Sequence, residues 1–208
     1  LTIFINFIYL AFWLIISIDI CFGSYLTKLF FRISPSLIGL FVILFSWYLL
    51  LSFNASDTTI ISDSQGLLFF NDSFEGNLNY YFIFLFVLVS LVDTSAYTIG
   101  KLYGSTPLAE NISPNKTLEG FISSLLIPLT IIYFSLTYLF NIPILINDLL
   151  FILLCSTYCT IGDLFISILK RNNEVKDTGG LLPGHGGVLD RVDSYLPVIP
   201  IFQFWLFL

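Results

Sequence analysis

Charged residues are scarce in this sequence of 208 residues: Asp, Glu, Lys and Arg make up 11% of it, whereas 57% of the residues are hydrophobic. In a soluble domain about a quarter of the residues are charged, so the composition indicates an integral membrane protein. Basic residues are scarcer than acidic ones, and the net charge of −6 argues against the basic surface that nucleic-acid binding requires. We therefore expect the lipid bilayer, and no nucleic acid, among the partners.

Methionine is absent and cysteine is rare. The lack of a Met at position 1 predicts a processed or truncated chain. All three cysteines fall in apolar segments, so neither a disulfide framework nor a zinc-binding pattern is present. Cys155 and Cys159 share one face of a predicted helix, and packing explains both of them best.

Long apolar runs dominate what the sequence does contain. Six segments are predicted to form helices in the membrane, and they are residues 1–22, 36–53, 80–100, 119–140, 149–169 and 196–208. The last is short enough to be a short span, a re-entrant piece or a cut-off helix. The sequence therefore predicts an all-α, polytopic bundle of about six transmembrane helices. Residues 1–79 would form the N-terminal spans and residues 80–208 a catalytic membrane region.

Lys and Arg are confined to alternate connectors. All eight lie after the first, third or fifth apolar segment, and the other connectors have none. Positively charged connectors stay in the cytoplasm. We therefore expect cytoplasmic active-site loops and a first residue on the outer side.

Two acidic residues lie inside apolar segments. Asp93 comes seven residues and Asp163 six residues before the predicted cytoplasmic end of a span, and an unpaired Asp in a span costs about 3 kcal/mol. One interpretation is structural, with a hydrogen bond or an ion pair to a neighbouring Lys. The other is functional, with two carboxylates facing a hydrated pocket at one depth.

The most polar stretch, residues 167–193, contains the single histidine and five of the thirteen glycines. Asp190 and Asp193 would share a helix face and, with Asp163, would offer the oxygen ligands that suit Mg²⁺. The alternative is a charge cluster on a solvated helix end. The glycines around His185 form either a phosphate-binding nest or a simple turn. The basic residues able to neutralise a triphosphate there are Lys170, Arg171, Lys176 and Arg191.

A second polar stretch precedes the fourth span. Ser113, Lys116 and Thr117 follow a predicted turn and are able to hold phosphate oxygens. Thr117 is equally a helix N-cap, with Glu119 in the first turn. The two roles are compatible. Together these patterns favour phosphoryl or nucleotidyl transfer onto a lipid, with a divalent metal.

Residues 167–193 resemble the signature of the phosphatidate cytidylyltransferases, or CDP-diacylglycerol synthases. The matching positions are Ser167, Lys170, Arg171, Lys176, Asp177, Gly179, His185, Gly186, Gly187, Asp190, Arg191 and Asp193. Residues 93–120 also resemble this family, although Asn115 and Leu118 replace a Lys and a Trp that are usual there. The chain is short for the bacterial type, which fits the expected truncation.

The resemblance implies a nucleotidyltransferase of phospholipid biosynthesis that converts CTP and phosphatidate to CDP-diacylglycerol and pyrophosphate. It implies Mg²⁺ at Asp163, Asp190 and Asp193 and a monovalent cation beside the Mg²⁺. Asp93 would either support these ligands from behind or bind a second cation. The implied catalytic residues are Lys116, Asp163, Lys176, Asp177, His185, Asp190, Arg191 and Asp193. The implied nucleotide-binding residues are Ser113, Lys116, Thr117, Lys170, Arg171, His185, Gly186 and Gly187.

We also expect a homodimer. It would lie in a bacterial inner membrane or an organelle membrane, with its active site on the cytoplasmic face. Three alternatives remain open. Another CTP-dependent lipid enzyme, such as a polyprenol or phytol kinase or a CDP-archaeol-type synthase, would use similar residues. A polytopic transporter would use intramembrane Asp residues as ion sites. An inactive scaffold is the third.

Overall fold

The computed structural model describes residues 2–24, 26–27, 35–55, 78–110, 112–175, 178–179, 187 and 189–206. The longer helices are α1 (Thr2–Cys21), α3 (Pro35–Ala55), α6 (Leu78–Tyr103), α7 (Leu118–Phe134) and α8 (Ile146–Asn172). A π-helical turn, η1 (Ser135–Leu139), continues α7, and the short helices α9 (Leu189–Val192) and α10 (Tyr195–Leu206) end the described chain. Strands β1 (Pro107–Ala109) and β2 (Ser113–Thr117) form an antiparallel hairpin.

The described helices confirm an all-α polytopic membrane protein. Four stretches are long and apolar enough to cross a bilayer: Phe4–Cys21, Phe82–Tyr103, Leu118–Leu139 and Ile146–Asn172. Two shorter apolar helices, Ile38–Leu51 and Tyr195–Trp205, correspond to the second and sixth predicted spans. Helices α6 and α8 each run three residues beyond the predicted ends at Gly100 and Leu169.

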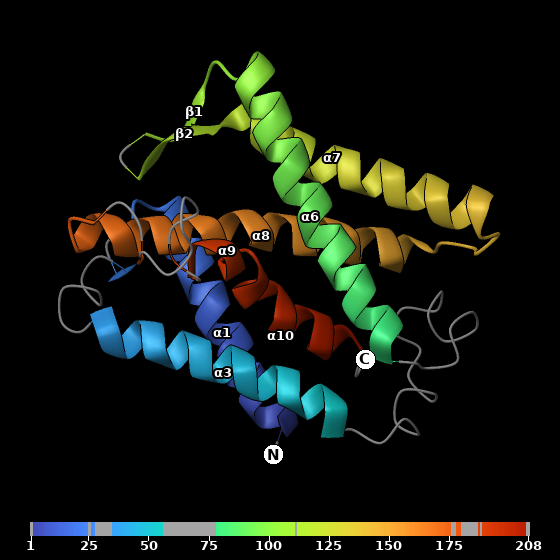
Figure 1. Cartoon of the computed structure of the whole chain (residues 1–208), viewed down its shortest axis with the longest axis horizontal. Helices are drawn as coiled ribbons and strands as arrows, with labels where there is room; N and C mark the ends of the chain where they lie inside the picture. The colour runs from blue at the N-terminus through green and yellow to red at the C-terminus, as the bar shows by residue number, and fades with distance from the viewer. Residues whose placement is uncertain are drawn as a thin grey trace.

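Helix α8 is the centre of the bundle (Figure 1). Half of its apolar stretch is buried inside the protein, compared with 22–28% for the other three long spans. One buried cluster joins α8 to α6, α7 and α10 and includes Phe151, Cys155 and Cys159. A second joins α8 to α1, α3 and α10 around Trp13 and Phe165. The two cysteines are therefore packing residues, as predicted.

Helices α6 and α7 cross closely where two glycines meet. A Cβ atom on Gly120 would lie 2.8 Å from the carbonyl oxygen of Ala96 and 3.2 Å from the Cα atom of Gly100. No side chain fits at that distance, so glycine is what allows the two backbones to approach. The Thr117 hydroxyl accepts a hydrogen bond from the Gly120 N–H at 3.2 Å and caps α7, as predicted.

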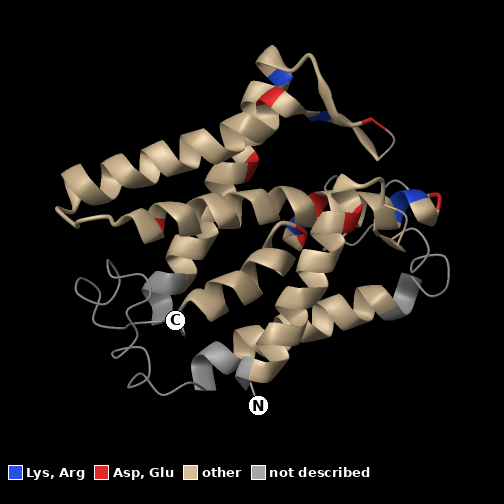
Figure 2. Ribbon diagram, turned by 180° about the vertical axis from the view of Figure 1, so that it is seen from behind, with Lys and Arg blue, Asp and Glu red and all other residues tan. Residues whose placement is uncertain are grey.

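The described Lys and Arg residues gather at one end of the bundle (Figure 2). This end contains the C-termini of α6 and α8, the N-termini of α7 and α10, and the hairpin. Consecutive spans therefore run antiparallel, and the polar connectors after α6 and α8 meet at the same end. The pocket described next opens there.

Candidate functional site

A cavity of about 500 Å³ lies between the hairpin and helices α6, α7 and α8. Its volume is in the range of small-molecule sites. Helix α8 contributes one polar stripe to its wall, and the stripe consists of Asp163, Ser167, Lys170 and Arg171. These positions repeat at helical spacing, so one face of one helix carries acidic, hydroxyl and basic groups in order from the interior toward the polar end.

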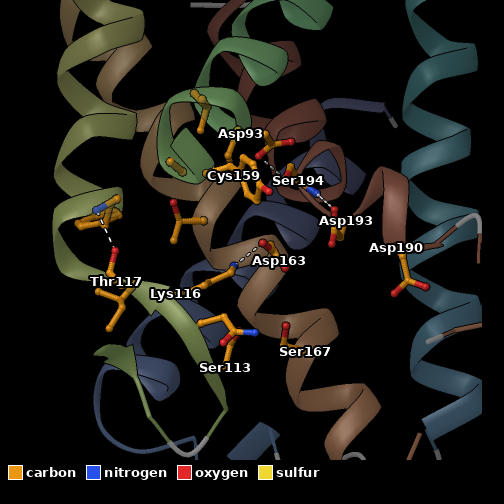
Figure 3. Close-up of a pocket in the computed structure, with 18 of the residues that line it drawn as sticks. Asp93, Ser113, Lys116, Thr117, Cys159, Asp163, Ser167, Asp190, Asp193 and Ser194 are labelled. Atoms are coloured by element: carbon orange, nitrogen blue, oxygen red, sulfur yellow. Dashed lines mark hydrogen bonds and ion pairs between the residues drawn. The ribbon is translucent and has the colours of Figure 1, made fainter. Parts of the chain in front are cut away.

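Three carboxylates converge on the inner part of the cavity (Figure 3). Asp163 of α8 forms an ion pair with Lys116 of β2. Asp93 of α6 accepts a hydrogen bond from the Ser194 hydroxyl at 3.1 Å, and Asp193 accepts one from the Ser194 N–H at 2.8 Å. Ser194 thus links α6 to the turn between α9 and α10. The structural and functional interpretations of Asp93 and Asp163 are both supported, because the two residues are partnered and also line the cavity.

Negative charge is in excess at this inner group. Burial, the neighbouring Asp163 and, to a smaller extent, Asp93 raise the pKa of Asp193 to about 7 against the opposing effects of the Ser194 N–H and Lys116. Three carboxylates and one ammonium group leave two uncompensated negative charges when all are ionised. Such a group favours binding of a cation.

Gly162 sets the distance between Asp163 and Asp193. A Cβ atom on Gly162 would lie 2.8 Å from the Cδ and Cγ atoms of Pro197 and would collide with the carbonyl oxygen of Asp193. The absence of a side chain lets the turn before α10 rest directly on α8. The inner carboxylates are neighbours because of this contact.

Asp190 has a different environment from the inner carboxylates. Its Oδ1 atom accepts a hydrogen bond from the Lys170 ammonium at 2.9 Å. Its Oδ2 atom accepts from the Thr178 N–H at 2.9 Å, the Thr178 hydroxyl at 2.8 Å and the Gly187 N–H at 3.0 Å. Burial raises the pKa of Asp190, but these hydrogen bonds outweigh it and lower the pKa to about 2. Asp190 therefore clasps two separate parts of the polar stretch against the end of α8.

The hairpin is braced at both of its ends. Glu119 accepts hydrogen bonds from the hydroxyls of Ser105 at 2.7 Å and Thr106 at 2.6 Å, which fixes the segment before β1 to the first turn of α7. At the tip, Ile112 is buried, and its carbonyl oxygen accepts a hydrogen bond from the Arg171 Nε atom at 3.4 Å. Lys116 is consequently presented to the cavity from a fixed backbone.

Most of the predicted site residues meet at this cavity. Its lining includes Asp93, Ser113, Lys116, Thr117, Asp163, Lys170, Arg171, Asp190 and Asp193. Gly187 does not line the cavity itself, but its N–H donates a hydrogen bond to the lining residue Asp190. Arg191 lies exposed on α9. Lys176, Asp177, His185 and Gly186 lie outside the described residues. Sequence reasoning did not find the roles of Gly162, Thr178 and Ser194, because each acts through a contact distant in sequence or through its backbone.

The donor types at the cavity fit a hard divalent cation. Asp163 and Asp193 offer carboxylate oxygens, which Mg²⁺ prefers, and Mg²⁺ is commonly held by one or two carboxylates together with water and substrate phosphates. Within the described part of the chain, no three acidic, His or Cys side chains are grouped closely enough to hold a metal ion alone. The arrangement suits a metal that arrives with a phosphate ligand.

Comparisons with known proteins agree with this chemistry. The profile described as "Cytidylyltransferase family" matches residues 2–208. The chain is similar to the phosphatidate cytidylyltransferase of Staphylococcus aureus (strain COL), with 42% identity over 145 residues, 68% of this chain and 54% of the relative. It is also similar to that of Bacillus subtilis (strain 168), with 44% identity over 127 residues, 61% of this chain and 47% of the relative. The chain spans about half the length of these curated relatives.

Proposed function

Because the chain belongs to the cytidylyltransferase family, we propose that it transfers the cytidylyl group of CTP to phosphatidate, giving CDP-diacylglycerol and pyrophosphate. The observation that carries the proposal is the cavity at the polar end of membrane helices, where Lys116 and Lys170 pair with carboxylates and Arg171 lines the wall. A nucleotide triphosphate needs cationic groups, and a lipid acceptor needs a site within reach of the bilayer. A transporter would need neither the clasp at Asp190 nor cations grouped around the cavity.

The proposed reaction is one displacement at phosphorus. An oxygen of the phosphatidate phosphate forms a bond to the α-phosphorus of CTP, and the bond from that phosphorus to the bridging oxygen of the β-phosphate breaks. Pyrophosphate leaves with that electron pair. The acceptor is already an anion, so the protein does not need a strong general base, and catalysis rests on alignment and charge neutralisation.

The residues of the chain supply these two contributions. Lys116 and Arg171 would contact phosphate oxygens, and the Asp190 clasp would hold the glycine-containing stretch near the nucleotide. Asp163 and Asp193 would hold Mg²⁺, which neutralises charge on the transferred phosphate. Asp190 and Asp93 remain predicted ligands, although Asp190 would first have to release Lys170 or its backbone partners. The monovalent cation, the homodimer and the cytoplasmic orientation of the site also remain proposals.

The test measures pyrophosphate release in detergent with CTP, phosphatidate and Mg²⁺. We expect phosphatidate-dependent turnover in the wild type and a loss of about 100-fold or more in Asp190→Asn, since a misplacement of about 1 Å can cost that much. Glu174→Gln makes the same charge change at an exposed position after α8 and should retain turnover. No release with any phospholipid acceptor, from protein that is folded, would refute the proposed function.

A further inference from the structure

Lys116 places its ammonium group beside the inner carboxylates, which would also attract a bound cation. It pairs with Asp163 and, unlike the two neighbouring carboxylates, it lowers the pKa of Asp193. The dashed contact in Figure 3 shows its side chain extended from β2 toward the inner carboxylates. The ammonium group therefore neutralises part of the charge that a divalent metal ion would neutralise.

The other basic residues of the cavity wall have different partners. Lys170 bonds to Asp190 at 2.9 Å, and Arg171 donates from Nε to the Ile112 carbonyl oxygen at 3.4 Å. Both lie further along α8 toward its C-terminus than Asp163 does. Among the lining residues that the structure describes, Lys116 is thus the basic side chain paired with the inner carboxylates.

The position of Lys116 allows its side chain to change partners without movement of the hairpin. Hydrogen bonds of Glu119 and the buried Ile112 fix the two ends of the hairpin. Lysine itself is a point charge on a flexible four-carbon stem, and a fifth of this side chain is exposed (21%). The ammonium group can therefore reorient inside the cavity while the backbone of the hairpin stays in place.

We propose that Lys116 is an internal counter-ion that holds the metal site in the nucleotide-free protein and moves to the phosphates when metal and nucleotide bind together. The proposal rests on the proposed function, since it assumes a metal-bound nucleotide. A divalent ion at Asp163 repels the ammonium group, and the incoming phosphates attract it. Metal and nucleotide should therefore strengthen the binding of each other by the same factor, as thermodynamic linkage requires.

The first experiment measures binding of Mn²⁺, as a paramagnetic substitute for Mg²⁺, to the full chain in detergent without nucleotide. We expect Lys116→Met to bind Mn²⁺ at least about tenfold more tightly than the wild type, because the competing cation is gone, and Lys116→Arg to bind like the wild type. Lys101→Met is the matched control. Lys101 lies on the exposed end of α6 against Tyr97, so its loss changes the net charge equally but leaves the inner carboxylates unchanged.

A second measurement adds nucleotide to the same binding assay. A non-hydrolysable CTP analogue should tighten Mn²⁺ binding to the wild type, and the tightening should shrink in Lys116→Met. Without nucleotide, unchanged or weaker Mn²⁺ binding in Lys116→Met would overturn the proposal, and so would a gain in affinity in Lys101→Met as large as that in Lys116→Met. A wild type whose Mn²⁺ affinity is the same with and without the nucleotide analogue would also overturn it. These results are independent of turnover. Tight Mn²⁺ binding by Lys116→Met beside a wild type inactive on phosphatidate would refute the proposed acceptor and retain the counter-ion.

Discussion

Substitution of Gly162 by Ala should separate the inner carboxylates without removing any functional group. The new Cβ atom would lie 2.8 Å from two atoms of Pro197, and ordinary contact begins at 3.4 Å. The start of α10 must then move by about 0.6 Å (3.4 − 2.8), and by more at the Asp193 carbonyl oxygen, which the Cβ atom would overlap. Overpacking of this kind costs about 1–3 kcal/mol, and a shift approaching 1 Å at a reacting group can cost about 100-fold in rate.

Two measurements test this reasoning together. Pyrophosphate release should fall about 10- to 100-fold in Gly162→Ala, and thermal unfolding in detergent should occur at a lower temperature. Gly39→Ala is the matched control, because a Cβ atom at Gly39 on α3 meets nothing within 4 Å, and it should retain wild-type turnover. If Gly162→Ala kept turnover within twofold of the wild type, the contact between α8 and the turn before α10 would not position the site.

Three further predictions concern the same cavity. The raised pKa of Asp193, about 7, means that protons compete with metal below neutrality, so Mn²⁺ affinity without nucleotide should be about tenfold weaker at pH 6 than at pH 8, and Asp193→Asn should remove this dependence. Gly187→Ala should abolish turnover, because its Cβ atom would lie 2.8 Å from the Gly179 nitrogen and break the hydrogen bonds that Asp190 accepts. The unfolding temperature of the membrane helices should not change, and normal turnover would refute the role of these hydrogen bonds. Glu119→Gln weakens the hydrogen bonds from Ser105 and Thr106 and should raise the KM for CTP several-fold with little change in kcat; a change in kcat alone would contradict a bracing role.

Much of the fold was predictable because membrane spans depend on local composition. Each predicted apolar segment corresponds to a described helix, and the Thr117 cap follows from the preference of Thr for that position. The β1–β2 hairpin was not predicted, since its strands have three and five residues and contain two prolines. Its pairing depends on bracing by Glu119 and Ile112, which no local pattern reveals.

The site was predictable in its members but not in their pairing. Charged residues stand out in an apolar chain, so Asp93, Asp163 and Lys116 were found from their surroundings alone. Spacing grouped Asp190 with Asp193, yet the structure directs Asp190 toward Lys170 and Thr178 and directs Asp193 toward the interior. The partners of Asp190 lie 12 and 20 residues before it in the sequence. The three-residue spacing between Asp190 and Asp193 gives no information about these partners. The metal and nucleotide assignments stay predictions.

The polar stripe of α8 fixes the distance between the places where the two proposed substrates would bind. From Asp163 to Arg171 the helix advances eight residues, which is about 12 Å at 1.5 Å per residue. A continuous helix, half-buried along its length, fixes that interval more rigidly than loops would. One end of the stripe can therefore meet a phosphate still attached to a lipid in the membrane while the other meets a nucleotide in water, so that neither substrate has to leave its own phase.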